Sequence, residues 1–172
     1  MQMILLAAVD RKRAIGRNGS LLYRVPEDLR HFKQLTVGNI VICGRKTLES
    51  FPGGKPLPDR ETVVLSRQYE NTAEYPQLTV ARTPKEALEC VSSLRKDAQN
   101  VYVIGGESVY RLFLDRCDTA LLTEIDAETP DADAFFPELR TQDGWHAAES
   151  SPVQISSSGL SFRYVTYKKE NG

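Results

Sequence analysis

Short apolar runs alternate with amphipathic stretches along the whole chain, and this alternation limits the possible folds more than any other property. The apolar runs are rich in Val, Ile and Leu and have the length of strands, as at residues 4–9, 40–43 and 101–104. Continuous apolar runs are typical of strands covered on both faces, and helical stretches between them are typical of parallel sheets. The sequence therefore predicts an α/β fold with helices on both faces of its sheet.

The expected helices and strands follow from these patterns. The expected strands are Ile4–Val9, Ile40–Cys43, Thr62–Ser66, Leu78–Ala81, Val101–Ile104 and Ala120–Ile125, with two more near the C-terminus around a turn at Ser156–Gly159, the second being Leu160–Tyr167. The expected helices are Pro26–Thr36, Arg45–Phe51, Pro84–Arg95 and Glu107–Leu114. We predict a single domain over residues 1–172 with one mostly parallel mixed sheet of about eight strands, about four flanking helices and a C-terminal antiparallel hairpin.

The charge balance argues against nucleic acid as a partner. The chain has 22 Lys and Arg residues against 23 Asp and Glu residues, a formal net charge of −1, and so lacks the basic excess of nucleic-acid-binding proteins. Met3–Val9 is too short for a signal peptide, and no segment approaches membrane-spanning length. The three cysteines form no C-x-x-C motif, and Cys43 lies in an apolar run that predicts a buried thiol. We therefore expect a cytoplasmic protein that binds neither nucleic acid nor membrane.

Asp28 is the first candidate for chemistry. On the predicted helix it shares an apolar stripe with Leu29 and Phe32, whereas a polar side carries Glu27, Arg30, His31 and Gln34. An aspartate that faces apolar surroundings must be paired, or its pKa must rise. Two interpretations follow. Asp28 only favours the first helical turn, where acids commonly lie, or it faces a pocket and binds a cationic or donor-rich heterocycle.

Glycines and cations follow several of the predicted strands. Gly44–Thr47 and Gly105–Ser108 each lead from a strand into a helix, where free N–H groups favour phosphate. If the strands are parallel, four cations lie at one edge of the sheet: Arg45, Lys46, Arg67 and Arg82. Such an edge suits a dinucleotide with an additional 2′-phosphate. The alternative is that these side chains are solvated surface charges.

Two further charged segments allow more than one interpretation. Arg60 ends a Pro-rich loop, where it either clamps a ligand carboxylate or pairs with Asp59 or Glu61. The acids between Glu124 and Asp133 lack the spacing of a calcium loop. We expect them to form a solvated connection without a metal.

Taken in order along nearly the whole chain, these segments resemble the dihydrofolate reductase family. The series consists of Ala8-Val9, Ile15-Gly16, Pro26-Glu27-Asp28-Leu29, Phe32-Lys33, Thr36, Gly44-Arg45-Lys46-Thr47, Glu49-Ser50, Pro56-Leu57-Pro58-Asp59-Arg60, Leu65-Ser66, Val103-Ile104-Gly105-Gly106, Val109-Tyr110, Thr123 and Phe136-Pro137. Each segment alone is common, whereas the ordered series is specific. The resemblance implies a monomer that reduces dihydrofolate to tetrahydrofolate with NADPH and binds antifolate inhibitors.

The resemblance also implies a role for each matching residue. Asp28 binds the amidine-like edge of the pterin and tunes protonation through water, Thr123 supports that edge, and Arg60 holds the carboxylate of the glutamate tail. The other implied substrate contacts are Leu6, Ala8, Leu29, Phe32, Phe51, Ile104 and Tyr110. The implied cofactor contacts are Ala8, Ile15, Gly16, Leu21, Gly44, Arg45, Lys46, Thr47, Leu65, Ser66, Ile104, Gly105, Gly106, Glu107, Ser108, Val109 and Tyr110, with Arg67 and Arg82 at the 2′-phosphate. The family often has a cis bond at the position of Gly105-Gly106.

The chain departs from the family at Leu22-Tyr23, where Pro-Trp is usual. The missing indole N–H commonly holds a water near the acid, and we assign a similar catalytic role to the Tyr23 hydroxyl. Loss of the proline frees the loop backbone. Ser108 stands where some relatives have a basic residue, so we expect the 2′-phosphate site to depend more on Arg67 and Arg82.

Three other functions share part of this pattern. A pyrimidine reductase of riboflavin synthesis would share the fold and the cofactor, but Asp28, Phe32 and Arg60 favour a folate. A catalytically silent folate- or nucleotide-binding protein is suggested by Leu22-Tyr23 and disfavoured by the intact Asp28. Gly106–Tyr110 nearly matches the G-x-S-x-G motif of hydrolases, yet it lacks the final glycine.

Overall fold

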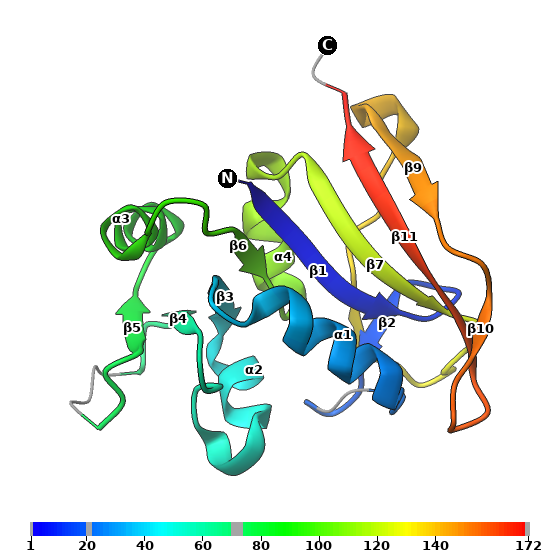
Figure 1. Cartoon of the computed structure of the whole chain (residues 1–172), viewed down its shortest axis with the longest axis horizontal. Coiled ribbons are helices and arrows are strands. Elements are labelled where there is room, and N and C mark those ends of the chain that lie inside the picture. The colour runs from blue at the N-terminus through cyan, green and yellow to red at the C-terminus, as the bar shows by residue number, and fades with distance from the viewer. Residues whose placement is uncertain (1, 20–21, 70–73, 171–172) are drawn as a thin grey trace.

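The computed structural model describes residues 2–19, 22–69 and 74–170. Its strands are β1 (Met3–Val9), β2 (Ala14–Gly16), β3 (Ile40–Gly44), β4 (Glu61–Leu65), β5 (Leu78–Ala81), β6 (Val101–Val103), β7 (Thr119–Ile125), β8 (Ala134–Phe135), β9 (Trp145–Ser150), β10 (Gln154–Ile155) and β11 (Ser161–Lys169). The main sheet has the order β10-β11-β7-β1-β6-β3-β4-β5, and β9 also pairs with β11 (Figure 1). β2 and β8 form a separate small sheet.

The directions of the strands confirm the predicted fold class. All pairs from β7 through β1, β6, β3 and β4 to β5 are parallel. β11 runs antiparallel to β7, β9 and β10, and so forms the antiparallel C-terminal part of the sheet. The predicted turn before it is present, since the Ser156 N–H donates to the Leu160 carbonyl at 2.7 Å.

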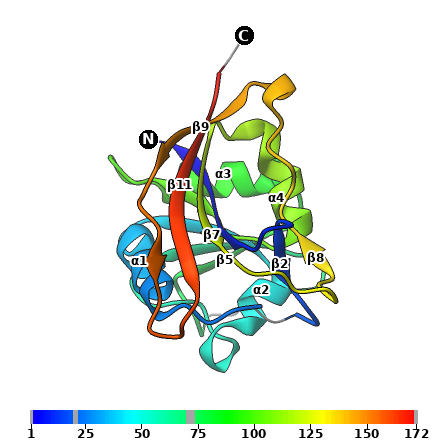
Figure 2. The ribbon, with the colours of Figure 1, turned by 90° about the vertical axis from the view of Figure 1, so that its right-hand side faces the viewer.

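The helices of the described chain cover both faces of the sheet. They are α1 (Pro26–Thr36), α2 (Arg45–Ser50), α3 (Pro84–Leu94) and α4 (Glu107–Phe113), with short 3-10 turns at Pro52–Gly54, Leu114–Arg116 and Thr141–Asp143. Figure 2 shows α1 on one side of β7 and β11, and α4 with the small β2–β8 sheet on the other. α1 begins at Pro26, where the missing N–H of proline has no helical partner to lose.

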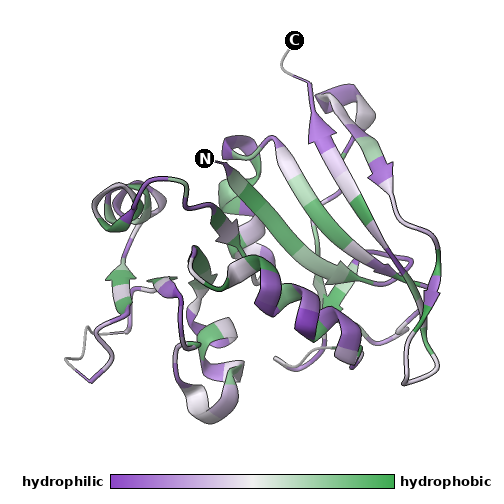
Figure 3. Cartoon of the chain, viewed as in Figure 1, coloured by the Kyte–Doolittle hydropathy of each residue, from purple (hydrophilic) through white to green (hydrophobic). Residues whose placement is uncertain are grey.

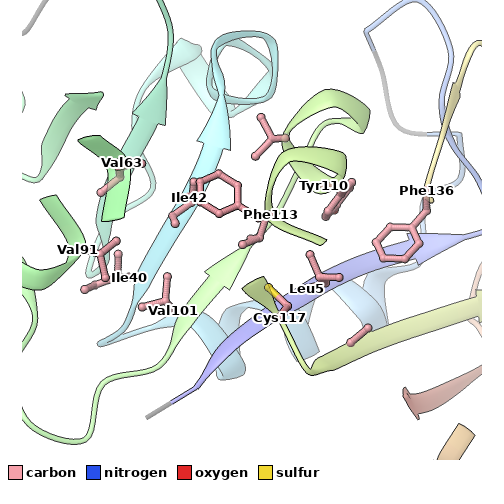
Figure 4. Close-up of a cluster of buried hydrophobic side chains, with 14 of the residues drawn as sticks. Leu5, Ile40, Ile42, Val63, Val91, Val101, Tyr110, Phe113, Cys117 and Phe136 are labelled. Carbon is pink, nitrogen blue, oxygen red and sulfur yellow. The ribbon is translucent and has the colours of Figure 1, made fainter. Parts of the chain in front are cut away.

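Alternating residues of the central strands supply two separate cores. Leu5 packs with Tyr110 and Phe113 on the α4 face (Figure 4), whereas its neighbours Ile4 and Leu6 pack with α1. The two-residue period of a strand explains this division. The ribbon of the central strands is accordingly the most hydrophobic part of the chain, while α1 shows polar residues outward (Figure 3). Burying each large apolar side chain contributes about 1.5–3 kcal/mol, so this two-sided core fixes the strand order.

Several features were not predicted, and each has a physical reason. β2 and β8 are only two or three residues long, whereas β10, directly before the predicted turn, is the first of the two expected C-terminal strands. β9 is exposed except for Trp145, so it shows no apolar alternation. Trp145 itself is buried, and so is Cys43, which carries a free thiol as expected. No helix within the described ranges is long and apolar enough to span a membrane.

Candidate active site

Asp28 lies in the first turn of α1 and faces the sheet. The Thr123 hydroxyl of β7 donates a hydrogen bond to the Asp28 carboxylate at 2.5 Å. Burial raises the pKa of Asp28, while the hydrogen bond from Thr123 and the charge of His31 act in the opposite direction. Asp28 therefore occupies a first-turn position and also faces inward, where the Thr123 hydroxyl meets it.

Register places two more residues beside Thr123 on this face. Ala8 of β1 and Tyr164 of β11 are its direct neighbours across the sheet. Because paired residues of adjacent strands point to the same side, Ala8, Thr123 and Tyr164 form a row under the first turns of α1. Thr123 is only 3% exposed, so its hydroxyl depends on Asp28 for a hydrogen bond.

Apolar side chains line the region next to this acid. Phe32, one turn after Asp28, packs in the same cluster as Leu6 and Ile104. Ile104 also belongs to the neighbouring cluster, in which Phe51 packs. Leu29 projects from α1 and is 47% exposed. The arrangement brings one acid and a set of apolar and aromatic groups to the carboxyl ends of β1 and β6, where ligands of parallel sheets bind.

The predicted cationic edge is present. Gly44 of β3 pairs with Leu65 of β4, and Leu65 pairs with Ala81 of β5. The residues that follow these three positions therefore lie at one edge of the sheet: Arg45, Lys46, Ser66, Arg67 and Arg82. The Arg82 guanidinium donates to the Arg67 carbonyl at 2.5 Å. Arg45 forms an ion pair with Glu49 at 3.1 Å.

The two glycine-containing turns adjoin each other at this edge. The Gly44 N–H donates to the Gly105 carbonyl at 2.8 Å, which links the start of α2 to the start of α4. The Gly105-Gly106 peptide is cis. Gly105 has φ +110, and a Cβ there would lie 3.0 Å from the Tyr110 ring, so only glycine fits without strain. Neither Gly44 nor Gly106 provides a side-chain cap, which leaves the first helical N–H groups open to an anion.

The other residues of the second turn have different environments. Ser108 is exposed, while Val109 is buried behind it. Glu107 accepts a hydrogen bond from the Phe135 N–H of β8 at 2.6 Å. Tyr110 is buried and donates to the Leu6 carbonyl at 2.7 Å. This carbonyl, an implied acceptor for the pterin amino group, thus already accepts one bond, and its second lone pair is the one a ligand would use.

A comparison with known proteins decides the family. The sequence profile of dihydrofolate reductase matches residues 2–169. The chain belongs to the dihydrofolate reductase family. It is 35% identical over 168 residues to the dihydrofolate reductase of Neisseria gonorrhoeae, covering 97% of this chain and 98% of that protein. It is 39% identical over 158 residues to that of Mycobacterium leprae, covering 90% of each.

The family resemblance extends to other microorganisms. Dihydrofolate reductase HdrB of Haloferax volcanii is 38% identical over 146 residues, covering 80% of this chain and 72% of that protein. The match over almost the full length agrees with the ordered series of segments in the sequence.

Tyr23 lies at the position where this dihydrofolate reductase family member departs from the usual Pro-Trp, and its hydroxyl is bonded to a residue other than Asp28. Its hydroxyl is hydrogen-bonded to that of Thr129 at 2.6 Å, in the connection between β7 and β8. Its ring packs with Val25 and Phe162. The expectation that the phenol serves the acid is therefore not supported by its hydrogen bond. Leu21, an implied cofactor contact, lies outside the described residues, whereas Ile15 and Gly16 lie in β2.

Arg60 is 7% exposed and is fixed by uncharged acceptors. Its guanidinium donates to the Pro58 carbonyl at 2.8 Å and to the Thr36 hydroxyl at 3.1 Å. Among the described residues no carboxylate lies within ion-pair distance of it. Of the two alternatives from the sequence, the ion pair with Asp59 or Glu61 is not formed, because the loop folds the side chain back toward α1.

A further cavity lies away from Asp28. It measures about 460 Å³ and lies between β7, β11 and the segment Phe136–Leu139. Its charged groups are already paired: Glu124 accepts hydrogen bonds from Arg163 at 2.9 Å and from Tyr167 at 2.5 Å. We place the candidate site at Asp28 and not at this cavity, because burial raises the pKa of Asp28 and the apolar cluster of Phe32 and Ile104 lies next to it.

His31 and Tyr164 are residues of the site that the sequence analysis missed. Helical spacing assigns His31 to the polar side of α1, but its ring stacks on Tyr164 with centroids 4.1 Å apart. The polar neighbour Glu27 is also engaged, with the Ser156 hydroxyl at 2.6 Å. Both contacts come from the C-terminal hairpin, which packs along this side of the helix. No local sequence signal predicts such a contact.

Proposed function

We propose that the protein reduces dihydrofolate to tetrahydrofolate with NADPH as the reductant. The observation that carries this proposal is the hydrogen-bonded Asp28–Thr123 pair next to an apolar wall, in a chain of the dihydrofolate reductase family. A carboxylate in that position accepts two hydrogen bonds from an amidine-like edge. Burial strengthens these bonds, because less water competes for the carboxylate.

We assign the substrate-binding roles that the family resemblance implies. Asp28 and Thr123 bind and orient the pterin edge, and the carbonyls of Leu6 and Ile104 accept from its amino group. The side chains of Ala8, Leu29, Phe32, Phe51 and Tyr110 form the apolar walls around the rings. Arg60 holds the carboxylate of the glutamate tail, and its bonds to Pro58 and Thr36 fix the guanidinium in advance. A guanidinium fixed in this way loses less conformational entropy on binding.

Asp28 also controls the proton that the reduction consumes. Burial raises its pKa, so the carboxyl keeps its proton to higher pH than an exposed aspartate would. We assign it the role of tuning protonation through water while the apolar wall excludes bulk solvent. Positioning and proton control of this kind are what the protein contributes to a hydride-transfer reaction.

The residues at the sheet edge fit a phosphorylated dinucleotide. Glycine at positions 44, 105 and 106 lets a ligand approach the backbone, and the edge carries several cations and hydroxyls. The residues that would hold NADPH are Ala8, Ile15, Gly16, Leu21, Gly44, Arg45, Lys46, Thr47, Leu65, Ser66, Ile104, Gly105, Gly106, Glu107, Ser108, Val109 and Tyr110. Arg67 and Arg82 would hold its 2′-phosphate. When bound, NADPH supplies the hydride.

The remaining properties are those expected of the family. The protein acts as a single-domain monomer in the cytoplasm, serves one-carbon metabolism and binds antifolates at the Asp28 site. Tyr23 contributes there by holding the loop before α1 to Thr129, instead of by contacting the acid.

The test is dihydrofolate-dependent oxidation of NADPH by the parent and by Asp28→Asn. The variant should lose about a hundredfold or more of its turnover, the effect of removing an acid–base group. Asp115→Asn is the matched control, because its carboxylate side chain is 95% exposed. Saturable NADPH binding without turnover in the parent would instead indicate a silent binding protein. Turnover of a pyrimidine substrate only would indicate a pyrimidine reductase.

A further inference from the structure

A group of polar side chains lies behind Asp28, between α1 and β11. The His31 imidazole stacks on the Tyr164 ring with an interplanar angle of 32°. His31 follows Asp28 by three residues on α1, so both side chains lie on neighbouring parts of one helix face. Tyr164 pairs across the sheet with Thr123, which donates to Asp28. Imidazole, phenol, hydroxyl and carboxyl thus adjoin one another in that order.

A small cavity lies among these groups. It measures about 50 Å³ and is lined by Leu6, His31, Leu121, Leu122, Thr123, Tyr164, Val165 and Thr166. This exceeds the ~15 Å³ that a single water requires, and a buried water also needs about two to four polar partners. His31, Thr123, Tyr164 and Thr166 can supply them. A water held here would connect the imidazole to Thr123 and, through its hydroxyl, to Asp28.

We propose that His31 is a positioning residue that controls the protonation of Asp28 from behind the substrate site, by its own charge and through a water in this cavity. The inference rests on the proposed function, because it assigns His31 to the protonation step of that site. His31 acts through Asp28 and Thr123.

The charged groups around His31 set the direction of the effect. His31 acts on Asp28 by its charge, and Asp28, Glu27 and Arg30 of α1 act on Tyr164 of β11, against which His31 stacks. The cavity walls from β1 and β7 are uncharged. Glu27 is held by the Ser156 hydroxyl and the Ser157 N–H. A protonated imidazole stabilises the Asp28 carboxylate and lowers its pKa. This influence acts only while the imidazole carries its positive charge.

The first test compares the pH dependence of kcat/KM for dihydrofolate in the parent, in His31→Gln and in His146→Gln. His146 is the other of the chain's two histidines and lies exposed on β9, which makes it the matched control. Between about pH 5.5 and 6.5, kcat/KM of His31→Gln should exceed the parent value about two- to fivefold, the effect of one partly exposed charge of about 0.5–1 kcal/mol. The two profiles should converge toward alkaline pH, because a neutral imidazole no longer acts on Asp28 by its charge. His146→Gln should follow the parent throughout.

A second test needs no turnover. In protein with ¹³C-labelled Asp carboxyls, the midpoint of the Asp28 titration should move to higher pH in His31→Gln. In the parent, the same resonance should respond again as the His31 ring titrates, and this measurement requires no variant to fold. If dihydrofolate is not reduced but these shifts occur, the proposed reaction fails while the coupling of His31 to Asp28 stands. A uniform loss of activity at all pH values, with an unchanged Asp28 titration, would show that His31 only packs on Tyr164 and would overturn the inference.

Discussion

Replacing Thr123 with valine removes one hydrogen bond from Asp28 and leaves the shape of the β7 face nearly unchanged. The bond measures 2.5 Å, and Thr123 is 3% exposed, so water has little access to replace it. Hydrogen bonds to charged groups contribute about 1.5–3 kcal/mol. At about 1.4 kcal/mol per factor of ten, that range corresponds to about a 10- to 150-fold loss in kcat/KM for dihydrofolate. We expect this loss of kcat/KM to appear as a higher KM, because the Thr123 hydroxyl orients the carboxylate that binds the pterin.

The pH profile provides a second readout for the same variant. The hydroxyl of Thr123 lowers the pKa of Asp28 against the effect of burial. Without it the carboxyl keeps its proton to higher pH, so the midpoint of kcat/KM against pH should move upward in Thr123→Val. Thr123→Ser keeps the hydroxyl and should retain most of the parent's KM and its midpoint. Equal KM values and equal midpoints in Thr123→Val and the parent would show that the Thr123 hydroxyl neither orients Asp28 nor lowers its pKa.

Three further predictions concern the cofactor edge, the glycine turn and the helix start. Arg67→Ala and Arg82→Ala should each weaken NADPH binding about tenfold or more and leave NADH binding nearly unchanged, since only NADPH carries the 2′-phosphate. Fluorescence titration measures both affinities. Equal losses for both cofactors would contradict the assignment of these arginines. Gly105→Ala should destabilise the protein by about 1–3 kcal/mol in thermal unfolding, because a side chain at φ +110 is strained and its Cβ would lie 3.0 Å from Tyr110. Gly159→Ala is the control, because Gly159 also has a positive φ but its Cβ would meet nothing within 4 Å. The difference between the two variants gives the effect of the contact with Tyr110. The hydrogen bonds from Ser156 and Ser157 lower the pKa of Glu27 from 4.5 to about 2. The stabilising effect of the Glu27 carboxylate is therefore present above about pH 4.5 and is lost as the pH falls toward 2. Glu27→Gln should reduce the free energy of unfolding at pH 7 but not below pH 2, and an equal reduction at both pH values would refute the role of the charge.

The central fold could be predicted because its strands carry unbroken apolar runs. β1, β3 and β7 are buried on both faces, so their identity is visible in any local window of the sequence. β9 could not be predicted, because only Trp145 is buried in it and its place is set by pairing with β11. Short strands such as β2 likewise depend on partners far along the chain.

The candidate site likewise has parts that the sequence could locate and contacts that it could not. Asp28 and the cationic edge could be located from helical spacing and from the common direction of parallel strands. The partner of the Tyr23 hydroxyl is a residue 106 positions away, and the ring against His31 belongs to the last strand. For Arg60 the sequence left open a ligand carboxylate or a neighbouring acid, and it did not indicate the bond to Thr36 at the end of α1. Contacts of this kind are decided by tertiary packing, which periodicity alone does not encode.

Transfer of label from cofactor to product tests the proposed reaction most directly. NADPH carrying deuterium at the transferring carbon of its nicotinamide is incubated with dihydrofolate and the protein, and the product is analysed by mass spectrometry. If hydride passes from NADPH to dihydrofolate, the parent should give tetrahydrofolate with one deuterium per molecule, and Asp28→Asn should give a strongly reduced yield. Unlabelled tetrahydrofolate, or oxidation of NADPH without any tetrahydrofolate, would contradict it.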